Sequence, residues 1–224
     1  MNVYGDWGNV LAILRRAQWH GYEPSVTAHH PGATFPQSVD IVIGGGGQDS
    51  GQGKIQDDLL AIGDKLHALA DLQVPMLMVC GLYQLFGHFF ETSEGERLEG
   101  IGIFDAETRG GPRRLIGNVV TSTAFGEIVG YENHSGLTSL AAGQPAFGRV
   151  VKGAGNNGQD KTEGAVHERV FGTYLHGSLL PKNPRFADVL LEAAALHRYG
   201  SFTAAEVDDR VADRARAVAR RRPR

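Results

Sequence analysis

Residues 74–85 read VPMLMVCGLYQL and decide the fold. The nearly unbroken apolar run over 74–79 predicts a strand covered on both faces, as inner strands of parallel sheets are. A helix is expected over 82–90, so a sharp strand-to-helix turn falls on Cys80 and Gly81. Such a turn lifts a side chain above the carboxyl edge of the sheet, in the manner of a nucleophile elbow.

Outward from this stretch, strand-like and helix-like patterns alternate, which indicates a mostly parallel central sheet with helices on both faces. The sheet is expected to become mixed in the middle third, where several strands follow one another. Further strands are expected over 39–43, 101–104, 115–120, 126–132, 147–152 and 170–175, and helices over 10–19, 54–72 and 183–198. No strand precedes the first helix, and two explanations stay open: a start inside a longer reading frame, or a fold that lacks this strand.

The composition excludes several classes of protein. The 224 residues suit one domain with a small extension, and a net charge of −3 gives no general reason to expect nucleic acid as a partner. One cysteine excludes a disulfide framework and a multi-cysteine metal site. The sequence shows no apolar run of the ~20 residues that span a bilayer and no secretory signal, so a cytoplasmic protein is expected.

The chain separates into a body over 1–200 and a basic extension over 201–224. Residues 207–224 hold seven arginines and three aspartates. Val207, Val211, Ala215 and Val218 fall at helical spacing, so the extension is interpreted either as a thin amphipathic helix or as a frayed, solvated tail.

Cys80 is the candidate nucleophile. A position at a helix N-terminus lowers the pKa of a thiol, and the N–H of Gly81 can donate to an oxyanion. The alternative is a buried cysteine that acts only as a small apolar residue. His176 is the candidate base, because it follows the apolar run 170–175 and would lie at the same sheet edge. The His29–His30 pair lacks nearby cysteine or carboxylate ligands, so no metal site is predicted.

A glycine-rich loop follows the strand at 39–43 and reads GGGGQDSGQGK over residues 44–54. It is not a Walker A loop, because Gln48 stands at the first required glycine and Ile55 at the required Ser or Thr. Nor does it fit the dinucleotide fingerprint, since the required later acid is missing. Such a loop can still direct backbone N–H groups at an anion, and a flexible turn is the alternative.

Five segments together resemble class I glutamine amidotransferases of the cobyric-acid-synthase type. Within that branch they are most similar to the glutaminase subunits of lipid II isoglutaminyl synthases. The segments are Tyr4–Val10, Gly44–Asp49, Cys80–Gln84, Gly130–His134 and Tyr174–Gly177, and the likeness runs from about residue 3 to about residue 200. It implies a three-layer, flavodoxin-like fold with a mostly parallel, partly mixed central sheet.

The resemblance also implies roles for particular residues. Cys80 would form a glutamyl thioester, with His176 as base and then acid. The N–H groups of Gly81 and Gly46 would form the oxyanion hole. Gln84 and Arg114 would bind the substrate glutamine, Arg114 through its carboxylate, although the adjacent Arg113 is an open alternative for that role.

One departure from the class concerns the third catalytic residue. Most class I enzymes carry a Glu two residues after the histidine, where this chain has Ser178. The resemblance implies a heterodimer in which a Mur-ligase-like subunit of the MurT type supplies an Asp to His176. No cofactor is expected in this chain, whereas ATP and Mg are expected at the partner's site.

The resemblance finally implies an acceptor for the ammonia that glutamine releases. The partner would amidate the D-glutamate α-carboxyl of the lipid II stem peptide. Two alternatives stay open: another acceptor such as corrinoid carboxylates, or a non-catalytic binding domain on the same fold.

Overall fold

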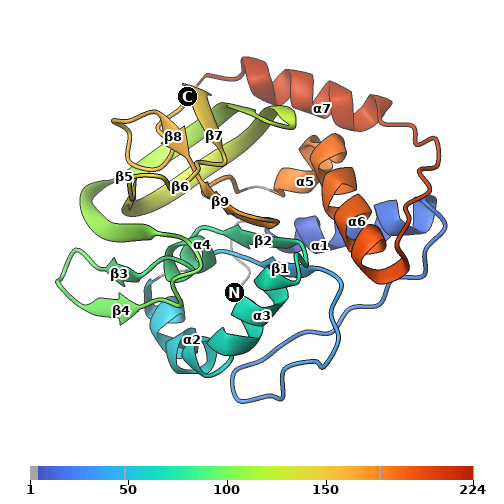
Figure 1. Ribbon diagram of the computed structural model, residues 1–224. Helices are drawn as coiled ribbons and strands as arrows, with labels where there is room; N and C mark the ends of the chain where they lie inside the picture. The colour runs from blue at the N-terminus through green and yellow to red at the C-terminus, as the bar shows by residue number, and fades with distance from the viewer. Residues whose placement is uncertain (1–4, 48, 177, 224) are drawn as a thin grey trace.

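The computed structural model describes residues 5–47, 49–176 and 178–223 (Figure 1). Tyr4, Gln48 and Gly177, which belong to the segments singled out above, lie outside these ranges. The helices are α1 (Trp7–Trp19), α2 (Asp49–Ala61), α3 (Gly63–Asp71), α4 (Gly81–Leu85), α5 (Leu179–Lys182), α6 (Pro184–Tyr199) and α7 (Arg210–Arg221).

A four-stranded sheet carries the site and has the strand order β1-β2-β10-β9. Its members are β1 (Val42–Gly44), β2 (Met76–Val79), β10 (Val170–Thr173) and β9 (Ala165–His167). The first three strands are parallel, and β9 runs antiparallel to β10. This arrangement confirms the mostly parallel, partly mixed sheet. Every residue of β2 is buried, as its apolar sequence predicts.

A second sheet has the order β4-β3-β5-β7-β8, and β6 pairs with β5. Its strands are β3 (Phe89–Glu91), β4 (Arg97–Glu99), β5 (Ala106–Thr123), β6 (Gly126–Leu140), β7 (Gly148–Lys152) and β8 (Thr162–Glu163). Strands β5 and β6 form a long hairpin beside the first sheet (Figure 1). The sequence predicts only separate strands at 115–120 and 126–132, because Gly110, Gly111 and Pro112 interrupt the alternating pattern. The pairing shifts register at this point.

Other predicted elements also differ in extent or type, among them the strand predicted over 39–43, which is Val42–Gly44. The helix predicted over 82–90 ends at Leu85, and strand β3 begins at Phe89. A Cβ on Gly87 would lie 2.6 Å from the Ala106 carbonyl oxygen, so this turn depends on glycine. Residues 101–104 form no strand, with bends at 103 and 104, and Gly102 has φ +69°. The single helix predicted over 54–72 is two helices, α2 and α3.

The helices pack beside the four-stranded sheet in two groups. Helices α1, α5 and α6 lie together, and α2 and α3 lie on the opposite side of this sheet (Figure 1). Buried Arg16 of α1 donates hydrogen bonds to Asp188 of α6 and to Asp209, each at 2.6 Å. Burial alone would lower the pKa of Arg16, but these two carboxylates raise it above its ordinary value. Arg16 therefore fastens residue 209 of the extension to the body.

The remainder of the extension forms helix α7, which lies along the β5–β6 hairpin (Figure 1). The Arg220 guanidinium donates to the Glu127 carboxylate at 2.6 Å, and Arg216 donates to the Glu127 carbonyl oxygen. Val211 and Val218 on this helix are exposed. Within the described ranges, no helix is both long and apolar enough to cross a membrane.

Candidate active site

Cys80 lies at the end of β2, directly before α4, in a strained backbone conformation. Its φ and ψ are 51° and −105°, a combination that a side chain disfavours at a cost of about 1–3 kcal/mol. Its N–H donates to the Thr173 carbonyl oxygen at 2.8 Å, which joins β2 to β10 at the carboxyl edge of the sheet. The residue is only 6% exposed. Residues 74–85 therefore form the sharp strand-to-helix turn that their sequence predicts.

His176 comes to the same edge from the end of β10. Its backbone N–H donates to the Tyr131 carbonyl oxygen of β6 at 2.7 Å, and the residue is fully buried. A Cβ on Gly46 would lie 2.5 Å from His176 Cε1 and 3.2 Å from Cys80 Cβ. Cys80, His176 and the glycine-rich loop therefore meet at Gly46, a position with no room for a larger side chain.

Asp6 completes this cluster, although the sequence analysis treats it only as part of a motif. Its two carboxylate oxygens lie 3.2 and 3.3 Å from His176 Nδ1, and one of them accepts the Gly46 N–H at 2.7 Å. A carboxylate at Nδ1 favours the tautomer that has its proton there, which leaves Nε2 as the basic nitrogen. Asp6 is 2% exposed. It therefore occupies the orienting position for which Ser178 is unsuited.

The segment around Asp6 is fitted to the residues that follow His176. A Cβ on Gly8 would lie 2.1 Å from Ser178 Oγ, so glycine is required for the close approach. Ser178 Oγ donates to the Gly5 carbonyl oxygen at 2.7 Å, and Asn9 Oδ1 accepts the Leu180 N–H at 2.9 Å. The contacts of Gly5, Gly8 and Asn9 fix this segment against residues 178–180. Asp6, which lies between Gly5 and Gly8, is thereby held against the imidazole of His176.

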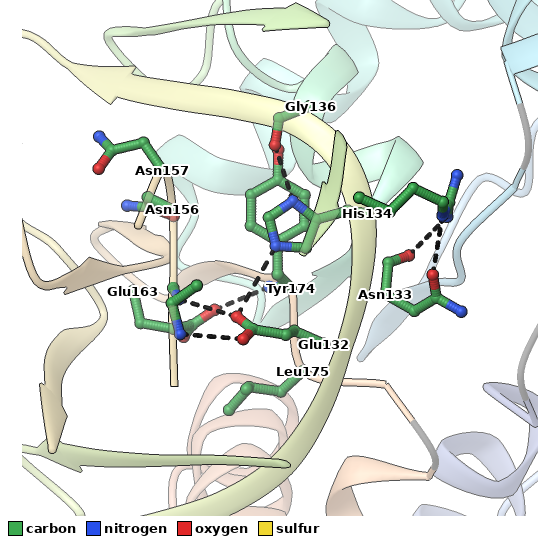
Figure 2. A network of polar contacts seen from close by, with 12 residues as sticks. Glu132, Asn133, His134, Gly136, Asn156, Asn157, Glu163, Tyr174 and Leu175 are labelled. Carbon is green, nitrogen blue, oxygen red and sulfur yellow. Dashed lines mark hydrogen bonds and ion pairs between the residues drawn. The ribbon is translucent and has the colours of Figure 1, made fainter. Parts of the chain in front are cut away.

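The segment Gly130–His134 of β6 braces Tyr174, Leu175 and His176 from the other side. A Cβ on Gly130 would lie 2.7 Å from Leu175 Cβ. The ring of His134 stacks on that of Tyr174 with centroids 3.5 Å apart, as Figure 2 shows. The residue types of this segment do not by themselves predict a role. The structure shows that it supports the backbone that carries His176.

Two buried carboxylates lie near this backbone, and one of them, Glu163, bonds to it directly (Figure 2). Glu132 accepts the N–H groups of Ala154 and Gly155 at 2.9 and 2.8 Å. Glu163 accepts the Tyr174 N–H at 2.8 Å and the Thr173 hydroxyl at 3.0 Å. Burial raises the pKa of Glu163 to about 8; the two hydrogen bonds lower it and nearby Glu132 raises it further. Burial therefore favours the protonated form of Glu163 in the folded protein.

The two groups assigned to the oxyanion hole differ in their surroundings. Gly81 is the first residue of α4 and follows Cys80 directly. The Gly46 N–H donates to Asp6, so this donor would serve an oxyanion only after Asp6 releases it. Both assignments remain predictions.

Gln84, which is predicted to bind the substrate, lies in α4. Its side-chain amide forms hydrogen bonds with other residues of the protein. Its Oε1 accepts from Gln52 Nε2 at 2.6 Å, and its Nε2 donates to the Tyr174 hydroxyl at 3.1 Å. Burial raises the pKa of Tyr174, and the nearby Cys80 thiol adds to the rise, so the phenol stays neutral. Contact between Gln84 and substrate remains a prediction.

Arg114 belongs to strand β5. Its Nε and Nη2 donate to the side-chain and backbone oxygens of Asn133, both at 2.9 Å. With Arg113 it lines a hollow of about 600 Å³ whose described lining includes neither Cys80 nor His176. The carboxylate-binding role of Arg114 remains a prediction, as does the choice between the two arginines. The described residues contain no group of three or more His, Cys, Asp or Glu suited to a metal ion.

Comparison with known proteins identifies one family. Residues 1–184 match the model of the CobB/CobQ-like glutamine amidotransferase domain. The chain is 38% identical over 221 residues to the GatD subunit of the glutamine-hydrolysing lipid II isoglutaminyl synthase of Staphylococcus aureus strain N315. That match covers 97% of this chain and 90% of the relative. The subunit of the same name from Streptococcus pneumoniae strain R6 is 35% identical, over 89% and 78%.

More distant matches share the fold. A cobyric acid synthase of Rhodococcus jostii strain RHA1 is 28% identical over 91% of this chain, but over only 40% of its own length. A solved glutamine amidotransferase structure from Thermotoga maritima superposes with a TM-score of 0.57 at 14% identity, over 98% of this chain and 90% of that one. The likeness confirms the flavodoxin-like, class I fold.

Proposed function

The chain belongs to the CobB/CobQ-like glutamine amidotransferase family, and we propose that it is the glutamine-hydrolysing subunit of a lipid II isoglutaminyl synthase. Family membership makes it a glutamine-hydrolysing enzyme. Two relatives that carry the name of this subunit match along nearly the whole chain, and they support the finer proposal. The observation that carries the chemistry is the convergence of Cys80, His176 and Asp6 around Gly46.

The proposed reaction runs in two steps. His176 takes the thiol proton while Cys80 Sγ attacks the side-chain amide carbon of glutamine. The C–N bond then breaks, the imidazolium protonates the leaving nitrogen, and ammonia departs from a glutamyl thioester. Water activated by the same imidazole then cleaves the thioester to glutamate and restores the thiol. Asp6 keeps the imidazole in the required tautomer and stabilises its protonated form.

We infer that the ammonia is used by a Mur-ligase-like partner, where ATP and Mg drive amidation of the D-glutamate α-carboxyl of the lipid II stem peptide. An acid from that partner was expected at His176 because Ser178 cannot orient an imidazole as a Glu does. Asp6 offers such an acid within this chain. If Asp6 is the orienting acid, the Asp6→Asn enzyme should lose activity even in the presence of the partner. If the partner supplies the acid, the Asp6→Asn enzyme should keep its activity.

The test is glutamine hydrolysis by the complex of this chain with the Mur-ligase-like protein from its own cell. We expect ammonia release, transfer to a lipid II substrate that depends on ATP, and covalent labelling of Cys80 by a diazoketone analogue of glutamine. The Cys80→Ala chain, assembled with the same partner, is the matched control and should show none of these. If Cys80 is labelled but ammonia is transferred only to corrinoid carboxylates, the proposed lipid II acceptor is refuted. If Cys80 is not labelled in the complex, a non-catalytic domain is favoured.

A further inference from the structure

A buried glutamine of α2 contacts the residue that follows the nucleophile. Gln52 is 1% exposed and lies eight residues after Gly44 in the glycine-rich segment. Its Nε2 donates to the Gly81 carbonyl oxygen at 3.1 Å and to Gln84 Oε1 at 2.6 Å. Both bonds use the donor end of the amide, so a carboxylate or an apolar side chain could not replace them.

The contacts continue from Gln84 to the strand that carries the base. Gln84 Nε2 donates to the Tyr174 hydroxyl at 3.1 Å. That hydroxyl also bonds to Thr138 Oγ1 at 2.6 Å, and Thr138 bonds to Thr108 Oγ1 at 2.8 Å. Tyr174 stands two residues before His176, and its ring is held by the stacked His134 (Figure 2). One line of hydrogen bonds thus joins the residue after Cys80 to the segment that ends in His176.

The backbone at Cys80 needs such support. A cysteine at φ +51° is strained, and strained conformations persist only where their surroundings hold them. Helix α4 has five residues, too few to be stable through its own hydrogen bonds. Gln52 bonds to the first and fourth residues of this helix, Gly81 and Gln84.

We propose that Gln52 is a positioning residue that fixes Gly81 and Gln84 relative to Tyr174, and thereby holds Cys80 in line with His176. This role rests on the proposed function, because its effect appears in the glutaminase reaction. The hydrogen bonds that define this role go from Gln52 to Gly81 and Gln84. Gln52 acts through Gly81 on one side and through Gln84 on the other.

The experiment compares Gln52→Met with wild type in the complex with the ligase partner. Methionine keeps the length of the side chain but removes both donors. We expect kcat for glutamine hydrolysis to fall about 10- to 100-fold, a larger change than any rise in KM, because reacting groups displaced by about 1 Å lose rate of that order. Gln56→Met makes the same chemical change one turn further along α2 and should leave both constants unchanged.

A second variant disturbs the network from the opposite side. A Cβ on Gly136 would lie 2.3 Å from Gln84 Nε2, 2.8 Å from Thr108 Cγ2 and 3.2 Å from the Tyr174 hydroxyl, so Gly136→Ala must displace this part of the network while Gln52 itself is unchanged. We expect the same loss of kcat, with thermal unfolding and near-UV circular dichroism showing that both variants are folded. If Gln52→Met fails to fold, Gly136→Ala decides the question.

Three results would overturn the role of Gln52. The first is a wild-type kcat in Gln52→Met, or in a folded Gly136→Ala when it decides alone. The second is an equal loss in Gln56→Met, and the third is a loss confined to KM. A wild-type complex that neither hydrolyses glutamine nor labels at Cys80 would instead refute the proposed function, and this role with it.

Discussion

Wild type should lose stability as the pH rises because of Glu163, and the Glu163→Gln variant should lack this loss. Burial raises the pKa of Glu163 from 4.5 to about 8. Between these two values the folded state keeps the proton and the unfolded state has lost it. Unfolding therefore releases a proton, and the free energy of unfolding falls by up to ~1.4 kcal/mol per pH unit.

Over the interval from about pH 5.5 to about pH 7.5, this group alone should cost wild type ~2.5 kcal/mol of stability. A Gln at 163 carries no titrating proton, and its amide oxygen can still accept the Tyr174 N–H that Glu163 accepts at 2.8 Å. Other titrating groups are the same in both proteins. The difference in free energy of unfolding between Glu163→Gln and wild type should therefore grow in favour of the variant across this interval.

The assay is urea unfolding of both proteins at a series of pH values. Glu96→Gln is the matched control, because it makes the same change at an exposed position and should give a curve parallel to that of wild type. A difference between Glu163→Gln and wild type that stays constant with pH would refute the reasoning. It would mean that Glu163 is ionised within the folded protein.

Three further changes test other parts of the molecule. Asp6→Asn in the complex should lower kcat roughly 10²- to 10⁴-fold at similar KM; steady-state glutaminase rates near wild type would place the orienting acid elsewhere. Arg114→Lys should raise KM for glutamine about 10-fold with little change in kcat, because lysine cannot form the guanidinium fork; an unchanged KM would remove Arg114 from the substrate site. Glu127→Ala removes the carboxylate that holds Arg220, so trypsin should cut within α7 several-fold faster while the melting temperature of the body stays the same; unchanged cleavage would refute that anchor.

The parts of the site that sequence could predict are those that end buried strands. An apolar run followed by Cys80 and Gly81 defines both the strand and its turn. His176 follows a second such run, and parallel strands bring their carboxyl ends to one edge. Hydrophobic pattern alone therefore places the thiol and the imidazole together.

Asp6 could not be placed in this way. It directly precedes α1, and the described residues place no strand before it, so no periodic pattern relates it to residue 176. Its position depends on the fit of Gly8 and Asn9 to residues 178–180, a tertiary contact. A usable signal was present nonetheless: Asp6 is the only acid in the first motif, and the expected acid after the histidine is replaced by Ser178.

The buried carboxylates and the long hairpin were missed for different reasons. Glutamate is normally exposed, so a pattern of apolar residues assigns no core position to Glu132 or Glu163. The hairpin pairs residues 106–123 with 126–140, but the glycines and proline near residue 111 break the alternation that would have predicted its full length. Hydrogen bonds to backbone groups position the two carboxylates, and strand pairing positions the hairpin. The periodicity of apolar residues reveals neither.

The hydrogen bond between Asp6 and His176 joins residues 170 positions apart along the chain. Closing a loop of that length has a large entropic cost, which is recovered only when the intervening sheets and helices have formed. Catalytic competence should therefore be among the last properties to return during refolding. The rate at which glutaminase activity recovers would then report completion of the whole domain, whereas helix content would recover earlier.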